Sequence, residues 1–172
     1  MTRLDSHKAR YLLLSLAVVV LDQWSKWLVE SRLVDHGPFV VVPGFLNFIF
    51  VKNTGVAFGM FAAHGNDWGW MILALLGMAA LALVALYFWK TPAADRLMLT
   101  ALALIMGGAV GNLIDRIANR AVTDFIDAYV GTYHWHTFNV ADSAITIGIC
   151  LMALDIFFGR REPAEASPPA AS

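Results

Sequence analysis

The chain alternates between long apolar runs and shorter polar segments, and four of the apolar runs have the length of a membrane span. They cover residues 11–29, 68–89, 97–114 and 140–158. About 20 helical residues cross a hydrocarbon core of about 30 Å, so each run is long enough for one transmembrane helix. The pattern therefore predicts an all-α integral membrane protein with four transmembrane helices.

The segments between these runs have a different pattern. Residues 38–61 are rich in Val, Ile and Phe and are interrupted by Pro43-Gly44 and Asn53-Thr-Gly55, which is typical of short strands joined by turns. Residues 45–51 are apolar on both faces of a strand, so we expect one face to rest on lipid or on a lipid-bearing ligand. We predict a small β-rich cradle between helices 1 and 2, and a short strand and loop segment over residues 117–139 between helices 3 and 4.

Composition agrees with a membrane protein of one domain. Hydrophobic residues make up 59% of the 172 residues, charged residues make up 15%, and the mean hydropathy is +0.63. We expect a single membrane domain over residues 1–161 and a disordered cytoplasmic tail over residues 162–172, which are rich in Pro, Ala and Ser. The net charge of −1 offers no basic excess for nucleic acid, and the lone Cys150 excludes an intrachain disulfide.

The positions of lysine and arginine predict the orientation of the helices. Four spans place both termini on one side of the membrane. That side carries seven basic residues in short flanks, Arg3, Lys8, Arg10, Lys90, Arg96, Arg160 and Arg161, and the other side carries five, Lys26, Arg32, Lys52, Arg116 and Arg120. Basic residues near span ends are retained in the cytoplasm, so we expect cytoplasmic termini and extracytoplasmic β-rich segments.

Acidic residues in or beside the spans indicate a structural or functional role, because burying each one at membrane depth costs a few kcal/mol. Asp22 and Lys26 lie four residues apart on one helical face, which predicts a structural ion pair. Four further acids belong to the extracytoplasmic end: Asp115, Asp124, Asp127 and Asp142.

Asp142 has the most informative setting of these four. If Asn139 caps the last helix, Asp142 lies in its first turn, where the helix dipole favours an ionised carboxylate. Asp124 lies beside Phe125 and Ile126, and burial would favour its protonated form. Two such carboxyl groups can share one proton and activate a water molecule without a metal. Spacing alone leaves Asp115, Asp124 and Asp127 all open as the partner of Asp142.

Other chemistries have weaker support in the sequence. The chain has no G-x-S-x-G or H-E-x-x-H motif, and His134 and His136 have no evident third metal ligand, so we expect no metal and no cofactor. Residues 107–111 form a small-residue face suited to close helix packing, and Asn112 and Arg116 extend from its external end. The alternatives to acid and base catalysis by such a pair are a small proton-coupled carrier, which would use the same acids as a proton relay, and a non-enzymatic assembly factor.

Five short blocks stand in order along the chain: Asp22-Gln-Trp-Ser-Lys26, Asn53-Thr-Gly55-Val-Ala-Phe58, Gly107-Gly-Ala-Val-Gly-Asn112-Leu-Ile-Asp115-Arg116, Val122-Thr-Asp124-Phe-Ile126 and Phe138-Asn139-Val-Ala-Asp142-Ser-Ala144. Each block alone is weak, but the five together, on a chain with four predicted spans, resemble the prolipoprotein signal peptidase family, also called signal peptidase II. Residues 133–137 carry no signature of this family.

The resemblance implies an intramembrane aspartic endopeptidase of the bacterial inner membrane. Such an enzyme cleaves the signal peptide from diacylglyceryl-modified prolipoproteins immediately before the lipidated cysteine. The resemblance implies that Asp124 and Asp142 are the catalytic pair, supported around the substrate by Asn53, Gly55, Asn112, Arg116 and Asn139. The implied partners are the diacylated prolipoprotein, membrane lipid and a globomycin-type inhibitor.

Overall fold

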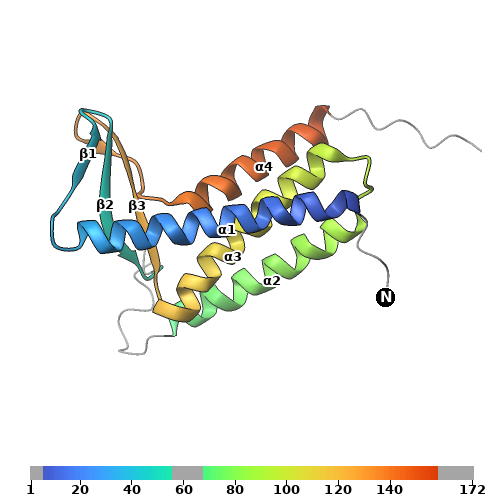
Figure 1. Cartoon of the computed structure of the whole chain (residues 1–172), viewed down its shortest axis with the longest axis horizontal. Helices are drawn as coiled ribbons and strands as arrows, with labels where there is room; N and C mark the ends of the chain where they lie inside the picture. Colours follow the sequence, from blue (N-terminus) through green and yellow to red (C-terminus); the bar gives the residue numbers. More distant parts are fainter. Residues whose placement is uncertain (1–5, 56–67, 159–172) are drawn as a thin grey trace, which may run out of the picture.

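The computed structural model describes residues 6–55 and 68–158, and this part of the chain forms four long helices and four strands (Figure 1). In chain order the elements are α1 (Ser6–Leu33), β1 (Phe39–Val42), β2 (Leu46–Asn53), α2 (Gly69–Lys90), α3 (Arg96–Asn119), β3 (Val122–Val130), β4 (Tyr133–His134) and α4 (Val140–Phe158). The last part of the predicted β-rich segment, residues 56–61, and the predicted tail over residues 162–172 lie outside the described residues.

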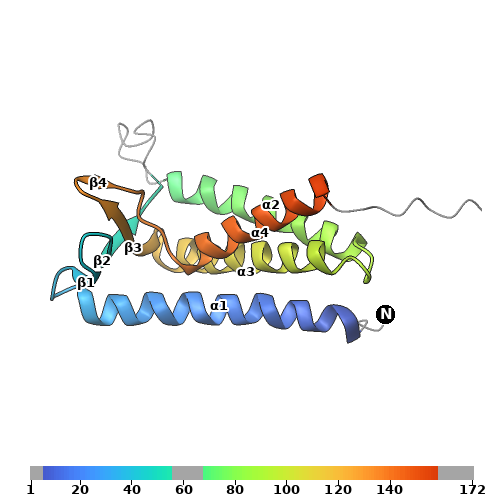
Figure 2. The same cartoon turned by 90° about the horizontal axis from the view of Figure 1, so that it is seen from above.

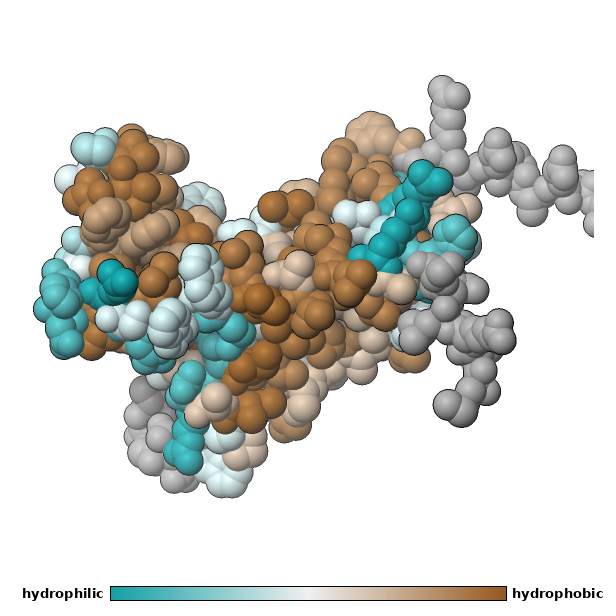
Figure 3. All heavy atoms as spheres, in the orientation of Figure 1, coloured by the Kyte–Doolittle hydropathy of each residue, from teal (hydrophilic) through white to brown (hydrophobic). Residues whose placement is uncertain are grey.

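Within the described ranges, four helices are long and apolar enough to cross a membrane, which confirms the predicted fold class. Apolar side chains cover the middle of the helix bundle in the view of Figure 3, and polar residues gather toward its ends. Two helices extend well past the predicted apolar runs, since α1 spans Ser6–Leu33 and α3 continues to Asn119. The buried Lys8 in the extended part of α1 donates hydrogen bonds to the carbonyl oxygens of Phe88 (3.1 Å) and Trp89 (2.8 Å) at the end of α2. A cation there satisfies carbonyl groups that the end of a helix leaves unpaired.

The helix α3 is the centre of the bundle and packs against α1, α2 and α4 (Figure 2). Glycines allow two of these contacts to be close. A Cβ atom on Gly107 would lie 2.8 Å from the carbonyl oxygen of Ser15 in α1, and one on Gly148 of α4 would lie 2.7 Å from that of Ala101 in α3. The small-residue face predicted in the third span therefore lies at a helix contact, as close backbone packing in membranes requires.

The two external segments form one sheet rather than two separate structures. The sheet has the order β1-β2-β3-β4, and all three strand pairs are antiparallel. The pairing of β2 with β3 places Val51 opposite Asp124 and Asn53 opposite Val122. This pairing joins residues that lie about 70 positions apart in the chain, on strands before the second helix and after the third.

The chain turns sharply between α3 and β3. Arg120 follows the last residue of α3 and adopts a left-handed conformation with φ of 57°, while its backbone N–H donates to the carbonyl oxygen of Arg116. Its guanidinium lies 5.7 Å from the ring of Trp70. The turn brings β3 back over the end of the bundle, so the sheet lies beyond one end of the helices (Figure 1). We call this end the sheet end.

Candidate active site

A buried ion cluster joins three helices toward the sheet end. Lys26 Nζ lies 2.8 Å from Asp22 Oδ2 and 3.0 Å from Asp115 Oδ2, and it donates a hydrogen bond of 3.1 Å to Asn112 Oδ1. Lys26 and both carboxylates are almost completely buried. The Asp22–Lys26 pair expected from the spacing is present. Lys26 also pairs with Asp115, which the sequence analysis considered as a possible partner of Asp142.

The same two carboxylates also hold neighbouring elements in place. Asp22 Oδ1 accepts a hydrogen bond from the backbone N–H of Ala141 (2.9 Å) in α4, and Asp115 Oδ2 accepts one from that of Thr123 (3.1 Å) in β3. Gln23 Nε2 donates to Asp115 Oδ1 (3.1 Å). Sequence reasoning missed Gln23, whose only signal was its place beside Asp22. Each charge of the cluster is therefore paired and hydrogen-bonded, as burial of charge requires.

Asn139 links Asp124 to Asp142. Its Nδ2 donates to Asp124 Oδ1 (2.7 Å), and its Oδ1 accepts from the backbone N–H of Asp142 (2.9 Å). In return Asp142 Oδ2 accepts from the backbone N–H of Asn139 (3.2 Å), so the two residues form a reciprocal cap at the start of α4. Of the three acids that spacing left open, Asp124 is the one that shares a hydrogen-bonded neighbour with Asp142.

Asn112 holds the other oxygen of Asp142. Its Nδ2 donates a hydrogen bond of 2.7 Å to Asp142 Oδ1, while its Oδ1 accepts from Lys26 Nζ. An amide that faces an ammonium with its oxygen must turn its NH₂ group the other way. The buried lysine therefore orients Asn112 toward Asp142.

Asp124 is 2% exposed, and the turn after β2 supports it. Asn53 Nδ2 donates to Asp124 Oδ2 (2.8 Å), and Asn53 Oδ1 accepts from the backbone N–H of Gly55 (2.9 Å). Gly55 has φ of +76°, a conformation that favours glycine. Asn53 and Gly55, both expected near the site, thus act as one unit that holds the carboxyl of Asp124.

The surroundings of Asp124 favour its protonated form. Burial raises the pKa of the Asp124 carboxyl above its ordinary value. The hydrogen bond from Asn53 opposes this rise, whereas the nearby charge of Asp142 adds to it. Asn139 and Lys26 also lower the pKa, but the net direction is upward.

Two of the residues considered from the sequence lie apart from this pair. Asp127 Oδ1 lies 2.7 Å from His134 Nδ1, and Asp127 Oδ2 accepts from Asn47 Nδ2 (3.3 Å). Three residues along a strand is about 10 Å, so Asp127 has its own set of partners away from Asp124. The Nη1 atom of Arg116 donates to the carbonyl oxygen of Asn112 (3.4 Å) in its own helix. Within the described part of the chain, Arg116 makes no hydrogen bond or ion pair with an aspartate.

The two histidines do not converge on one point. His134 pairs with Asp127, whereas His136 Nδ1 lies 3.2 Å from the carbonyl oxygen of Thr137. Among residues 6–55 and 68–158, no group of three or more His, Cys, Asp or Glu side chains has the arrangement of a metal site.

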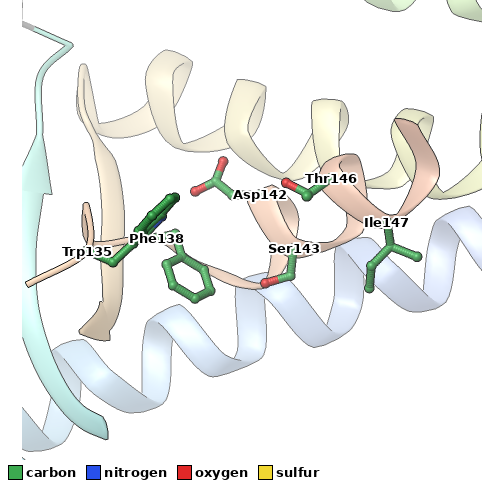
Figure 4. Close-up of a pocket in the computed structure, with 6 residues that line it drawn as sticks. All are labelled: Trp135, Phe138, Asp142, Ser143, Thr146 and Ile147. Carbon is green, nitrogen blue, oxygen red and sulfur yellow. The ribbon is translucent and has the colours of Figure 1, made fainter. Parts of the chain in front are cut away.

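Two cavities open beside the carboxyl pair. One has a volume of about 360 Å³ and is lined by Trp135, Phe138, Asp142, Ser143, Thr146 and Ile147 (Figure 4). The other has a volume of about 240 Å³ and is lined by Val51, Lys52, Asn53, Thr54, Asp124, His136 and Thr137. A ligand that lay across both cavities would contact both carboxyl groups.

Four apolar helices with a sheet at one end and a buried acidic site beside it define a multi-pass membrane protein. Two solved structures with a similar fold are both described as bacterial membrane enzymes. One has a TM-score of 0.77 with 29% identity over 88% of this chain and 95% of its own. The other has a TM-score of 0.70 with 30% identity over 91% of this chain and 95% of its own.

Sequence comparisons identify the family. The family model described as signal peptidase (SPase) II matches residues 14–158. A lipoprotein signal peptidase of Solibacter usitatus is 42% identical over 87% of this chain and 92% of its own length, and one of Acinetobacter baylyi is 40% identical over 88% and 84%. The chain belongs to the signal peptidase II family. It is therefore a multi-pass bacterial membrane protein and a protease of the signal peptidase class.

Proposed function

We propose that this protein is an aspartic endopeptidase that removes the signal peptide from diacylglyceryl-modified prolipoproteins, cutting immediately before the lipidated cysteine. Asp124 and Asp142 are its catalytic residues. The observation that carries the proposal is that Asn139 binds both residues, so that two carboxyl groups from different elements share one polar site beside two cavities. Membership of the signal peptidase II family supports the same activity.

We infer the roles of the two carboxyl groups from the difference between their surroundings. Asp142 lies in the first turn of α4 and accepts hydrogen bonds from Asn112 and from the backbone of Asn139, which stabilise a negative charge. Burial raises the pKa of Asp124, which favours the proton on that residue. Asp142 is therefore the base in the resting pair, and Asp124 is the acid.

The reaction follows from these roles. Asp142 accepts a proton from water as the water oxygen attacks the scissile carbonyl carbon, and Asp124 gives its proton to the carbonyl oxygen. In the resulting tetrahedral diol the C–N bond then breaks. The nitrogen takes the proton held by Asp142, and Asp124 recovers a proton from a hydroxyl as the new carboxylic acid forms. Both residues return to their starting states, and no metal or cofactor takes part.

The surrounding residues position the pair. Asn53, Asn112 and Asn139 each donate a side-chain hydrogen bond to one of the two carboxyl groups. Gly55 gives the turn its shape, and the buried Lys26 sets the direction of the Asn112 amide. Arg116 lies one turn beyond Asn112 on α3, and we assign it to the substrate side of the site.

The proposed orientation places the sheet end outside the cytoplasm. Lys8, Lys90 and Arg96 all belong to the other end of the helices, where basic residues are retained in the cytoplasm. Both termini are then cytoplasmic, in the bacterial inner membrane. The pair lies at the outer edge of the membrane, where the end of a translocated signal peptide would arrive.

The test of this function uses purified protein and one precursor in two forms, diacylated and unmodified. We expect cleavage of the diacylated form alone, at the bond before the lipidated cysteine, as read by mass analysis of both products. A chelator should leave the rate unchanged, and a globomycin-type inhibitor should abolish cleavage. Equal cleavage of the unmodified form, or a cut at another bond, would contradict the proposal.

Replacement of Asn53 by Ala is expected to change the pH profile. The hydrogen bond from Asn53 lowers the pKa of Asp124, so its loss raises that pKa further above the ordinary value. The active pair needs one proton. The fall of kcat/KM at high pH, the alkaline limb of the pH profile, reports the loss of that proton. We therefore expect this limb to move to higher pH.

Asn47→Ala is the matched control for this variant, because Asn47 lies on the same strand and donates to Asp127 instead. Its pH profile should coincide with that of the unaltered protein. A shift of the Asn53→Ala limb to lower pH, or an equal shift in both variants, would show that Asn53 does not act on Asp124.

A further inference from the structure

The cavity beside Asp142 is bounded by two different parts of the chain. Trp135 and Phe138 come from the segment between β4 and α4, and Ser143, Thr146 and Ile147 follow Asp142 along α4 (Figure 4). Indole, phenyl and aliphatic groups form most of the wall. Residues 133–137 belong to none of the five family blocks, so the Trp135 wall is a feature of this chain that the family resemblance does not explain.

The aromatic wall is fixed to the strand that carries Asp124. The backbone N–H of Trp135 donates to the carbonyl oxygen of Ala128 (2.8 Å). The backbone of Phe138 donates to the carbonyl oxygen of Ile126 (3.2 Å) and accepts from the N–H of the same residue (2.8 Å). A ligand held by this wall would therefore have a defined position relative to both carboxyl groups.

The cavity opens on the outer surface of the bundle. Trp135 is 63% exposed and Ile147 is 53% exposed, and Thr146 is exposed as well. Because α4 is a membrane-spanning helix, its exposed face lies against lipid in the bilayer. An apolar group could therefore enter the cavity sideways from the membrane.

The size of the cavity limits what can enter. One turn of a helix with its side chains is about 10–12 Å wide and about 5.4 Å long, so it fills about 400–600 Å³, which is more than the cavity volume of about 360 Å³. A signal helix is therefore too large for this cavity, but a segment of a single hydrocarbon chain is not. The cavity also lies within the range of ordinary ligand sites, about 300–1,000 Å³.

We propose that this cavity is the subsite for one acyl chain of the diacylglyceryl group, and that Trp135 is the residue that determines the preference for a long chain. The inference rests on the proposed function, because it needs a diacylated substrate. It adds the place where the lipid is held and the residue that selects its length.

The contribution of this subsite is positional. A chain that moves from the bilayer into an apolar cavity exchanges one hydrocarbon surrounding for another, so it gains little hydrophobic free energy. It gains packing contacts and a fixed position, and a displacement of about 1 Å at a reacting bond can cost about 100-fold in rate. The acyl chain therefore aligns the scissile bond with Asp142. This alignment should raise kcat/KM for substrates with long acyl chains.

The test uses two precursors that differ only in acyl length, one dipalmitoyl and one dibutyryl. The cleavage of each is measured for the unaltered protein, Trp135→Ala and Trp135→Phe. We expect Trp135→Ala to lower kcat/KM for the dipalmitoyl form by about tenfold and to leave the dibutyryl form unchanged. Trp135→Phe should retain most of the preference. Thr146→Trp, which places a large ring in the cavity, should reproduce the selective loss without removing the wall.

Tyr133→Ala is the matched control, because Tyr133 is an exposed aromatic residue of β4 that does not line the cavity. It should leave both rates unchanged. If Trp135→Ala lowered kcat/KM equally for the two precursors, Trp135 would contact the peptide and the proposal would be overturned. An unchanged kcat/KM for both precursors would also overturn it. Failure of the unaltered protein to cleave the dipalmitoyl precursor would instead overturn the proposed function.

Discussion

Replacement of either Asp124 or Asp142 by Asn is expected to lower kcat by about 10²–10⁴-fold, the range that general acid and base groups contribute. The two losses have different causes. Asn at position 142 cannot accept the proton of the attacking water. Asn at position 124 can still donate a hydrogen bond to the carbonyl oxygen, but it cannot transfer a proton. Each substitution keeps the size of the side chain, so the site should keep its shape.

The rate of single-turnover cleavage of the diacylated precursor measures this loss, with thermal unfolding in detergent as the check on folding. Asp127→Asn is the control, because Asp127 is buried on the same strand as Asp124 but pairs with His134. It should keep the rate within a few-fold of the unaltered protein. Normal cleavage by Asp124→Asn or Asp142→Asn would rule out the proposed chemistry.

Replacement of Lys26 by Met is expected to cause the largest loss of stability. The variant leaves Asp22 and Asp115 buried without their cation, and removal of one partner from a buried ion pair costs about 3–5 kcal/mol. It also removes one of the two donors to Asn112 Oδ1 and leaves only the longer hydrogen bond from Asn139 Nδ2 (3.3 Å), so the Asn112 amide is held less firmly toward Asp142. We therefore expect a lower unfolding temperature together with a lower kcat in the protein that remains folded.

Lys52→Met is the comparison for this effect. Lys52 pairs with Glu30 at 3.2 Å, but their side chains are 31% and 50% exposed, and pairs that water reaches contribute about 0–1 kcal/mol. Thermal unfolding of both variants in the same detergent measures the difference. If Lys26→Met unfolded no earlier than Lys52→Met, the buried cluster would not hold the helices together.

Features that depend on neighbours along one helix were predictable from the sequence. Apolar runs of about 20 residues define the four helices because the thickness of the bilayer sets their length. The pair Asp22 and Lys26 follows from a separation of four residues on a helical face. The reciprocal cap of Asn139 and Asp142 follows from a separation of three residues at a helix start. In each case local geometry fixes the contact.

Contacts across loops could not be predicted in the same way. The partner of Asp142 stayed open among three acids, because a loop lets strand residues reach the helix end in several registers. In the structure Asp124 is the one of the three that shares Asn139 with Asp142, and this contact depends on how β3 meets the start of α4. The contact of Asp115 with Lys26 was also not predicted, because it depends on how α1 and α3 pack.

We propose that Asp124 and Asp142 act as one unit, and the cleavage rate of the double variant Asp124→Asn/Asp142→Asn measures whether they do. The rate losses caused by substituting residues that serve one step do not multiply, because the first substitution already removes the step. We predict that the double variant cleaves the diacylated precursor no more than a few-fold more slowly than the slower single variant. If the two losses multiplied, the carboxyl groups would act independently, and the shared-proton account would be wrong.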